Sequence, residues 1–512
     1  MLTLADVKAK LQERGLLLEV TGGLPQREIA WLTCDSRRAV RDTLFICKGE
    51  AFLPKYLEEA ARRGSIAYLS ESRIGTPEEL PGLIVSDIRK TMAVVSAQFF
   101  GYEPGRVKLT GITGTKGKTT TAWYLKAMLD RWEEAHGRPE TGLISTVENY
   151  DGISRREAVM TTPEAPAIHE MLGNAVRSGV RYTTMEVSSQ ALKYGRVREL
   201  QFQVGIFLNI SEDHISPREH VDFEDYFGAK LSIFRQTETA CVNLDSDRAD
   251  WILRAARKAG RVVTFGRNPQ ADLRCSDVKV SGEQVSFRVN CDRFSERFVL
   301  GMKGSFNIEN AMAAIAAAYV YGIPAAVMKE ALADTKVPGR MENFFSRDGH
   351  ICGVVDFAHN RLSFEKLFSA AFQEYDKYRQ IITVFGCPGG KALNRRKELG
   401  IIAGLFSDQV IITCDDPGME CQEDIAREVR GYVELTGCPV LCVPERREAV
   451  ERAVAMAGTS PVPTLILLLG RGSERYQQIG GKACLYPTDS RLMGQALEAY
   501  DRQTGMMRQR CV

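Results

Sequence analysis

Residues 107–120 read V-K-L-T-G-I-T-G-T-K-G-K-T-T, a β-branched strand that runs into a glycine-rich turn and then into a helical pattern ending near Trp132. Glycines let a backbone wrap closely around phosphate groups, and a helix N-terminus adds positive potential. Lys118 can reach terminal phosphates, and the Thr119 hydroxyl can bind Mg²⁺. Five residues separate Gly111 from Gly117, so the spacing is not the strict phosphate-loop spacing. A turn that merely joins strand to helix is the alternative, but the glycines, the Lys-Thr-Thr run and the strand together favour a phosphate loop.

The segments on both sides of this loop alternate between short apolar strands and helical patterns. Such a βαβα rhythm predicts an α/β fold with a largely parallel sheet flanked by helices. Pro104-Gly105 and Val337-Pro-Gly-Arg340 interrupt the rhythm and mark boundaries. A chain of 512 residues suggests about three domains. We therefore expect domains at residues 1–105, 106–337 and 338–512.

Composition narrows the class of protein. With 44% hydrophobic and 26% charged residues the chain is an ordinary globular one, which excludes disorder and coiled coil. A net charge of +2 argues against broad attachment to nucleic acid or to an anionic membrane. Gly322 and Pro324 interrupt the apolar run 311–328, so we expect a packed helix there and no membrane insertion. Thirteen scattered cysteines without a C-x-x-C pair, behind a charged N-terminus, predict reduced thiols and a cytoplasmic protein.

Two further strand ends carry side chains that suit a metal. Glu186 ends the stretch Y-T-T-M-E-V-S-S at 182–189, and Asp213-His214 follow the apolar stretch that begins at Phe207. Ligands beyond the carboxyl ends of parallel strands meet at one edge of a sheet. Oxygen ligands with one imidazole can hold a phosphate-bound Mg²⁺. The plainer alternatives are a surface or salt-bridged carboxylate for Glu186 and a satisfied core histidine for His214.

On these motifs the chain resembles the Mur ligases, ATP-dependent enzymes that form amide bonds in peptidoglycan precursor synthesis, over nearly its whole length. Within them it is most similar to the UDP-N-acetylmuramoyl-L-alanyl-D-glutamate ligases, which add the third residue of the stem peptide. The resemblance implies three domains: one for the UDP end of the substrate, a central P-loop-type parallel sheet for ATP, and a Rossmann-like C-terminal domain that brings the amino acid. It implies ATP and Mg²⁺ as cofactors, a UDP-N-acetylmuramoyl dipeptide and a free amino acid as substrates, and an acyl-phosphate intermediate. We expect a monomer.

The resemblance also implies roles for the residues that match the family's motifs. ATP is implied to contact Gly114, Thr115, Lys116, Gly117, Lys118, Thr119, Thr120, Asn307, Arg340 and Asp356. Mg²⁺ is implied to bind Thr119, Glu186, His214 and Lys230, the last as a carbamate. Lys118, Glu186, His214 and Lys230 form the implied catalytic set. The substrates are implied to contact Ser36, Thr161, Thr162, Ser188, Arg196, Arg396, Asp416, Gly470 and Glu474. From the sequence alone, Lys230 could equally be a surface lysine on an amphipathic helix, and Arg396 part of a solvated basic cluster.

A segment of the expected third domain indicates which amino acid the enzyme adds. Family members that take meso-diaminopimelate carry D-N-P-R, whose arginine suits a second carboxylate. Here the segment is Asp415-Asp416-Pro417-Gly418, so the cation is missing and an anion is added. An ε-ammonium would gain from this exchange, which favours L-lysine over meso-diaminopimelate, with ornithine or another amine left open. The segment 213–220, D-H-I-S-P-R-E-H, also resembles the lysine-adding branch.

Some positions depart from the family pattern. Lys116, Phe357, Asn360 and Ser473 replace the usual residues, and 387–391 lacks the G-D-R-D pattern. These departures concern mainly the third domain and leave the phosphate loop intact. Two alternatives stay open: a paralogous ligase that adds glutamate to folate or to a polymer, and a catalytically idle nucleotide-binding regulator.

Overall fold

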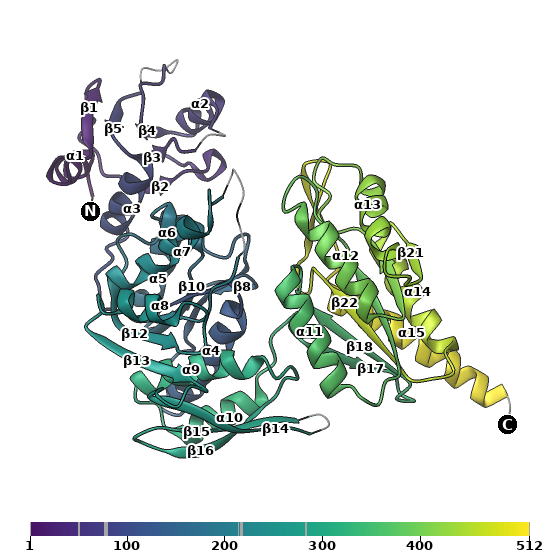
Figure 1. The fold of residues 1–512 in the computed structure, drawn as a ribbon. Coiled ribbons are helices and arrows are strands. Elements are labelled where there is room, and N and C mark those ends of the chain that lie inside the picture. The colour runs from purple at the N-terminus through teal and green to yellow at the C-terminus, as the bar shows by residue number, and fades with distance from the viewer. Residues whose placement is uncertain are drawn as a thin grey trace. The chain divides into compact units, whose positions relative to one another are not determined.

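The computed structural model describes residues 2–49, 52–75, 80–212, 215, 219–281 and 284–510. The chain divides into two compact units, Met1–Val263 and Thr264–Val512, and the division falls within β13 (Arg261–Gly266), which is labelled in Figure 1. The predicted α/β fold is confirmed. The domain boundaries stay predictions, and the division into units falls inside the range 106–337 predicted for the central domain. Within the part of the chain described here, no helix is long and apolar enough to cross a membrane.

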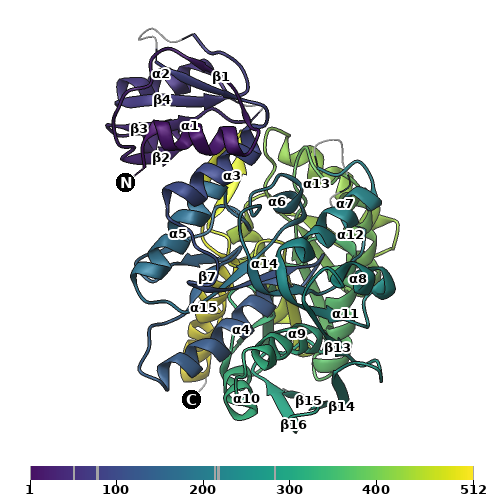
Figure 2. The same ribbon diagram turned by 90° about the vertical axis from the view of Figure 1, so that its left-hand side faces the viewer.

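The first sheet of unit 1 has five strands in the order β1-β5-β4-β3-β2, all neighbours parallel except β1 and β5. The helix α3 buries Ile88, Met92 and Val95 on one face, and the Asp87 side chain caps it by accepting from Lys90 N at 2.9 Å. Figure 2 shows α3 running from this sheet toward α5. The elements are α1 (Leu4–Glu13), β1 (Leu17–Thr21), β2 (Trp31–Thr33), η1 (Ser36–Arg38), β3 (Thr43–Ile46), α2 (Pro54–Arg62), β4 (Ser65–Ser70), β5 (Gly82–Val85) and α3 (Ile88–Phe99).

The second sheet contains the predicted phosphate-loop strand at its centre. In unit 1 its order is β12-β11-β6-β10-β7-β8-β9, and only β8 and β9 run antiparallel to their neighbours. The elements are β6 (Lys108–Thr113), α4 (Lys118–Glu134), β7 (Gly142–Ile144), β8 (Glu148–Tyr150), β9 (Arg155–Glu157), α5 (Ala165–Arg177), β10 (Tyr182–Glu186), α6 (Ser189–Lys193), β11 (Phe202–Phe207), α7 (Phe223–Leu231), η2 (Ser232–Gln236), β12 (Thr237–Asn243) and α8 (Ala249–Ala256).

Unit 2 begins with an antiparallel meander of β14 (Leu273–Ser281), β15 (Gln284–Asn290) and β16 (Ser295–Leu300). Two helices follow, α9 (Asn307–Val320) and α10 (Ala325–Asp334). Every residue of α9 from Ala311 to Ala318 is buried. Small side chains allow such close packing, so the apolar run is a core helix, as expected.

The third sheet is Rossmann-like, with the order β17-β18-β22-β19-β20-β21 and only β17 antiparallel to its neighbour. Its central strands read as unbroken apolar runs because helices cover both faces. The elements are β17 (Glu342–Phe345), β18 (Ile351–Asp356), α11 (Arg361–Glu374), β19 (Gln380–Phe385), α12 (Asn394–Phe406), β20 (Gln409–Ile412), α13 (Gln422–Glu434), β21 (Val440–Cys442), α14 (Arg446–Thr459), β22 (Thr464–Leu469), α15 (Asp489–Arg510) and the hairpin of β23 (Tyr476–Ile479) and β24 (Lys482–Leu485).

A fully buried ion pair joins the start of α14 to the start of α15. The Arg446 guanidinium donates to both oxygens of Asp489 at 2.7 and 2.6 Å, and neither side chain is exposed. Removing one partner leaves an uncompensated buried charge, so we expect Arg446→Met to lower the free energy of unfolding by about 3–5 kcal/mol. Urea unfolding of the full chain measures this. Arg430→Met, which removes an exposed pair on α13, is the matched control, with an expected loss below about 1 kcal/mol. Equal losses in the two variants would contradict the prediction.

Candidate active site

Four parallel strands of unit 1 end at one edge of the second sheet. β10 and β11 lie on either side of β6, with Glu186 opposite Ile112 and Phe207 opposite Thr113. β7 lies on the far side of β10. The segments that follow these strands therefore meet where ligands bind in open α/β sheets.

The phosphate loop follows β6 in the conformation that its glycines allow. Gly114 has φ 154°, and a Cβ there would lie 2.8 Å from the Cβ of Leu208. Gly117 has φ 84° and directly precedes α4, on whose first turn Thr119 and Thr120 are buried. Both glycines are thus required by the backbone path, which confirms the predicted strand–loop–helix geometry.

Asn209, at the end of β11, fastens the loop from the neighbouring strand. Its backbone carbonyl accepts from Thr115 N at 3.0 Å. Its side chain accepts from Lys116 N at 2.9 Å and donates to Lys116 O at 3.2 Å. The conformation of the loop is therefore fixed by contacts with Asn209 as well as by its own glycines.

The ammonium groups of two lysines donate hydrogen bonds to the same carbonyl of the loop. The Lys118 Nζ donates to Gly114 O at 2.9 Å and to Thr115 O at 3.3 Å. The Lys230 Nζ donates to the same Gly114 carbonyl at 2.9 Å, and it lies 4.6 Å from the ring centre of Tyr226. Lys230 is only 2% exposed, so it is not a surface lysine on an amphipathic helix. The Nζ atoms of Lys118 and Lys230 both lie 2.9 Å from the Gly114 oxygen. Their separation is therefore at most twice that distance.

Glu186 is a buried carboxylate at the same edge, 1% exposed. It accepts from the Thr119 hydroxyl at 3.0 Å, and from the backbone N–H and hydroxyl of Thr146 at 2.8 and 3.2 Å. No cationic side chain of the described residues pairs with it. A buried anion with only neutral donors leaves charge for a cation to balance. His214 and Asp213 lie outside the described residues.

The residues predicted to grip the dipeptide end cluster beside Glu186. The Thr162 hydroxyl donates to the backbone carbonyl of Glu186 at 2.9 Å and accepts from Ser188 N at 3.0 Å. Ser188 caps α6. Thr161 accepts from the Thr146 hydroxyl at 3.2 Å. The structure thus brings the predicted metal and muramoyl contacts together.

Arg196 extends this cluster toward the first sheet. It donates to Thr162 O at 3.1 Å and pairs with Glu164 at 3.2 Å. Glu164 also pairs with Lys48 at 2.6 Å. Ser36, on η1, donates to Glu59 at 2.8 Å. The segment that contains Thr162 and Glu164 therefore already orients the Arg196 side chain.

The nucleotide residues predicted in unit 2 are Asn307 at the start of α9, Asp356 at the end of β18, and Arg340 between α10 and β17. The Asn307 side chain, 1% exposed at the start of α9, donates to Lys303 O at 2.8 Å and accepts from Asn310 at 3.0 Å. Asp356 ends β18 and accepts from Met341 N at 2.8 Å. Burial raises the pKa of Asp356, and Arg340 acts in the opposite direction.

Three carboxylates surround a buried arginine where β20 and β22 end. Arg471, with no exposed side-chain surface, lies 3.2 Å from Asp416 and 3.9 Å from both Asp415 and Glu474. Burial, together with the negative charges of Asp415 and Asp416, raises the pKa of Glu474 to about 8, although Arg471 acts in the opposite direction. Gly470 lies against this cluster, since a Cβ there would be 2.5 Å from Asp415. Lys391 lies 3.9 Å from Asp416, so two cations face these three acids.

Arg396 is 4% exposed rather than part of a solvated cluster. Its guanidinium pairs with Glu420 at 2.7 Å and Glu428 at 2.6 Å. A substrate carboxylate at Arg396 would have to replace one of these partners. Its predicted role is untested by this geometry.

Sequence reasoning missed Thr146, Tyr226, Asp415 and Arg471 as site residues. Thr146 comes just after β7, so the rule that polar residues at strand ends form sites could have found it. Asp415 and Arg471 likewise follow β20 and β22. Tyr226, whose hydroxyl lies 3.1 Å from the Thr115 hydroxyl, stands within a helix and carried no such signal.

A phosphate loop on a parallel sheet, with a Rossmann-like sheet after it, defines a nucleotide-binding protein. Family models match as the Mur ligase middle domain at residues 112–318 and as the Mur ligase glutamate ligase domain at 339–472. The chain belongs to the Mur ligase family and is an ATP-dependent, amide-forming ligase of peptidoglycan synthesis.

Individual relatives and one solved structure show which ligases the chain is similar to. It is 35% identical to the "UDP-N-acetylmuramoyl-L-alanyl-D-glutamate--L-lysine ligase" of Enterococcus faecalis, covering 93% of each chain. It is 32% identical to the "UDP-N-acetylmuramoyl-L-alanyl-D-glutamate--2,6-diaminopimelate ligase" of Clostridium perfringens, covering 91% of this chain and 94% of that one. A solved structure titled as a ligase of the latter kind has a TM-score of 0.62 at 23% identity, covering 94% of this chain and 97% of that one. This last likeness shows the shared fold.

Proposed function

We propose that the chain adds L-lysine to UDP-N-acetylmuramoyl-L-Ala-D-Glu, with ATP converted to ADP and phosphate. The names of similar relatives include both a lysine and a diaminopimelate ligase, so they support the dipeptide substrate more than the amino acid. The observation that carries the choice is the acidic cluster of Asp415, Asp416 and Glu474 with Gly418 beside it. Such a site attracts an ε-ammonium and repels a second carboxylate.

The chemistry follows from the weakness of a carboxylate as an acyl donor, because O⁻ is a poor leaving group. Transfer of the γ-phosphoryl group to the D-glutamate carboxylate makes an acyl phosphate, which the amine attacks with loss of phosphate. Lys118 is placed to stabilise negative charge on the moving phosphoryl group. Thr162 and Ser188 orient the dipeptide beside it, and Arg196 holds its anionic end.

The donor set at the sheet edge fits Mg²⁺. The Thr119 hydroxyl and the buried Glu186 carboxylate provide oxygen ligands, and no cationic side chain of the residues described competes for Glu186. Bound there, Mg²⁺ would neutralise phosphate charge during transfer. His214 remains a proposed further ligand. Arg340, Asp356 and Asn307 are proposed to hold ATP from unit 2.

Lys230 is also proposed to bind Mg²⁺, as a carbamate. Its ammonium shares a carbonyl with Lys118, so two like charges crowd a buried space. Addition of CO₂ to a neutral Lys230 amine converts that repulsion into attraction. We expect a single carbamate signal in ¹³C NMR of the protein in ¹³C-bicarbonate, absent in Lys230→Arg and retained in Lys193→Arg. Full activity in CO₂-depleted buffer together with no such signal would refute this role.

Glu474 makes lysine binding depend on pH. With its pKa raised to about 8, the side chain is mostly protonated at pH 7, and an ammonium favours the carboxylate form. Lysine should therefore bind more tightly as pH rises, with KM falling about fivefold between pH 7 and 8 beyond the effect of the amine itself. Steady-state kinetics in Glu474→Gln provide the control, since that variant keeps only the amine's own dependence. Identical pH profiles in the two proteins would rule the coupling out.

The deciding experiment measures phosphate release with the UDP dipeptide, ATP and Mg²⁺. L-lysine, meso-diaminopimelate, L-ornithine and no amine are compared in parallel. Release that requires lysine supports the proposal. Release with diaminopimelate alone refutes the assigned amino acid while keeping the ligase, and release with tetrahydrofolate and glutamate alone points to the paralogous ligase. Nucleotide binding without turnover in any mixture would indicate the idle regulator.

A further inference from the structure

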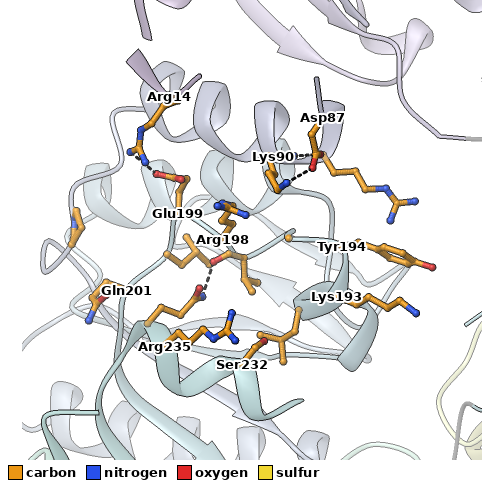
Figure 3. A pocket seen from close by; sticks show the side chains of 17 residues that line it. Arg14, Asp87, Lys90, Lys193, Tyr194, Arg198, Glu199, Gln201, Ser232 and Arg235 are labelled. Carbon is orange, nitrogen blue, oxygen red and sulfur yellow. Dashed lines mark hydrogen bonds and ion pairs between the residues drawn. The ribbon is translucent and has the colours of Figure 1, made fainter. Parts of the chain in front are cut away.

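A cavity of about 640 Å³ opens in unit 1, beside α3, the turn after α6, and η2. Figure 3 shows its lining side chains, from Arg14 at one end to Tyr194 at the other. Its volume lies within the range of small-molecule sites, roughly 300–1,000 Å³. Ser188 and Arg196, which carry the proposed dipeptide contacts, are not among the residues that line it. The cavity is therefore separate from the site described above.

The lining is strongly basic. Two carboxylates, Asp87 and Glu199, face six cationic side chains: Arg14, Arg89, Lys90, Lys193, Arg198 and Arg235. The whole chain carries a net charge of only +2. The positive charge is therefore concentrated here and is balanced by a negative excess elsewhere, which makes the cavity a local attractor for anions.

Three of the six cations are engaged by carboxylates. Arg14 pairs with Glu199 at 3.2 Å, and Lys90 with Asp87 at 2.7 Å. Lys193 pairs with a carboxylate outside the lining, at 2.6 Å. These pairs leave no carboxylate of the lining for the other cations.

The remaining three are arginines without an acidic partner among the described residues: Arg89, Arg198 and Arg235. The guanidinium carbon of Arg89 lies over the ring of Tyr194, 3.7 Å from the ring centre, and this contact restrains the guanidinium group. Arg198 and Arg235 stand in the middle of the cavity, between its two ends (Figure 3). Guanidinium groups present a planar fork of donors that matches phosphate oxygens.

We propose that this cavity binds a small molecule that carries at least two phosphoryl groups. Three guanidinium groups without an acidic partner among the described residues can bind a ligand that carries more than one negative charge. Leu192, Val197 and Leu200 add an apolar surface for the rest of such a molecule, and Tyr194 adds an aromatic one. The volume of about 640 Å³ suits a small molecule of ordinary ligand size. The site is independent of the proposed amino-acid specificity.

Calorimetric titration of the full chain with inorganic pyrophosphate at low ionic strength tests the proposal. Because pyrophosphate also suits the phosphate loop and the site for the diphosphate of the UDP dipeptide, the titration uses the Lys118→Ala background with saturating UDP dipeptide. We expect one site per chain, weakened at least tenfold by adding Arg198→Glu with Arg235→Glu. The matched charge reversals Arg257→Glu and Lys258→Glu, on an exposed surface after α8, should change the affinity less than twofold.

Three outcomes would overturn the proposal: no binding in the Lys118→Ala background, equal affinity in the cavity and control variants, or equal affinity for orthophosphate and pyrophosphate. Arg198→Gln with Arg235→Gln gives a gentler pair should the reversal disturb folding, with an expected weakening of at least fivefold. Titration with UDP and ADP distinguishes a nucleotide from free pyrophosphate, because contact of a base with Tyr194 would strengthen nucleotide binding in a way that Tyr194→Ala removes.

Discussion

Replacement of Lys118 by alanine is expected to lower kcat at least about 10³-fold. Its ammonium lies on the loop carbonyls of Gly114 and Thr115, next to where the helix N-terminus attracts phosphate. Negative charge on the transferring phosphoryl group is greater in the transition state than in bound ATP, so the loss should fall mainly on kcat. Phosphate release with saturating dipeptide, amine and ATP measures it.

The control for this variant is Lys258→Ala, which removes an exposed lysine after α8 and should leave kcat within twofold. Thermal unfolding of both variants establishes that folding is intact. A Lys118→Ala enzyme that keeps more than a tenth of the wild-type kcat would show that the loop does not position the reacting phosphates.

The second large effect concerns the choice of amino acid. Asp416→Asn together with Gly418→Arg removes an anion and adds a cation beside Arg471. We expect kcat/KM for L-lysine to fall about 100-fold and measurable turnover of meso-diaminopimelate to appear, because loss of a desolvated charge pair costs about 2–5 kcal/mol. Parallel kinetics with both amino acids measure the exchange.

The backbone can accept this change at a modest cost. Gly418 has φ 62°, where a residue other than glycine costs about 1–2 kcal/mol, and the nearest atom to an added Cβ is 3.8 Å away. Gly349→Arg is the matched control, since Gly349 has φ 71°, open space around it, and a place before β18 at the opposite edge of the sheet. An unchanged preference for lysine in the double variant would contradict the electrostatic account.

The local motifs were predictable because their physics is local. A β-branched strand, closely spaced glycines and a Lys-Thr-Thr helix start together favour a phosphate loop, and β6 and α4 lie where the sequence predicts them. The apolar runs that form β18, β19, β20 and β22 could also be predicted as strands, since strands covered on both faces contain few polar residues. Even Glu186 was recognised from its place at a strand end.

Other features depended on which strands became neighbours. The sequence does not show that Thr146 donates twice to Glu186, or that Lys230 and Lys118 share one carbonyl, since these partners are 40 and 112 residues apart. The sequence also gives no sign that Arg471 lies at the centre of the acidic cluster, because α13, β21, α14 and β22 separate it from Asp416 along the chain.

The sequence by itself determined the α/β class, the phosphate loop and the membership of a ligase family, because these depend on residue types at short spacings. Only the tertiary structure decided the electrostatic environment of the charged residues. It buried Glu186 among neutral donors, left Arg198 and Arg235 without acids, and surrounded Arg471 with three. The residue type gives the charge that a side chain can carry, but its solvation and its partners depend on which distant segments the fold brings beside it.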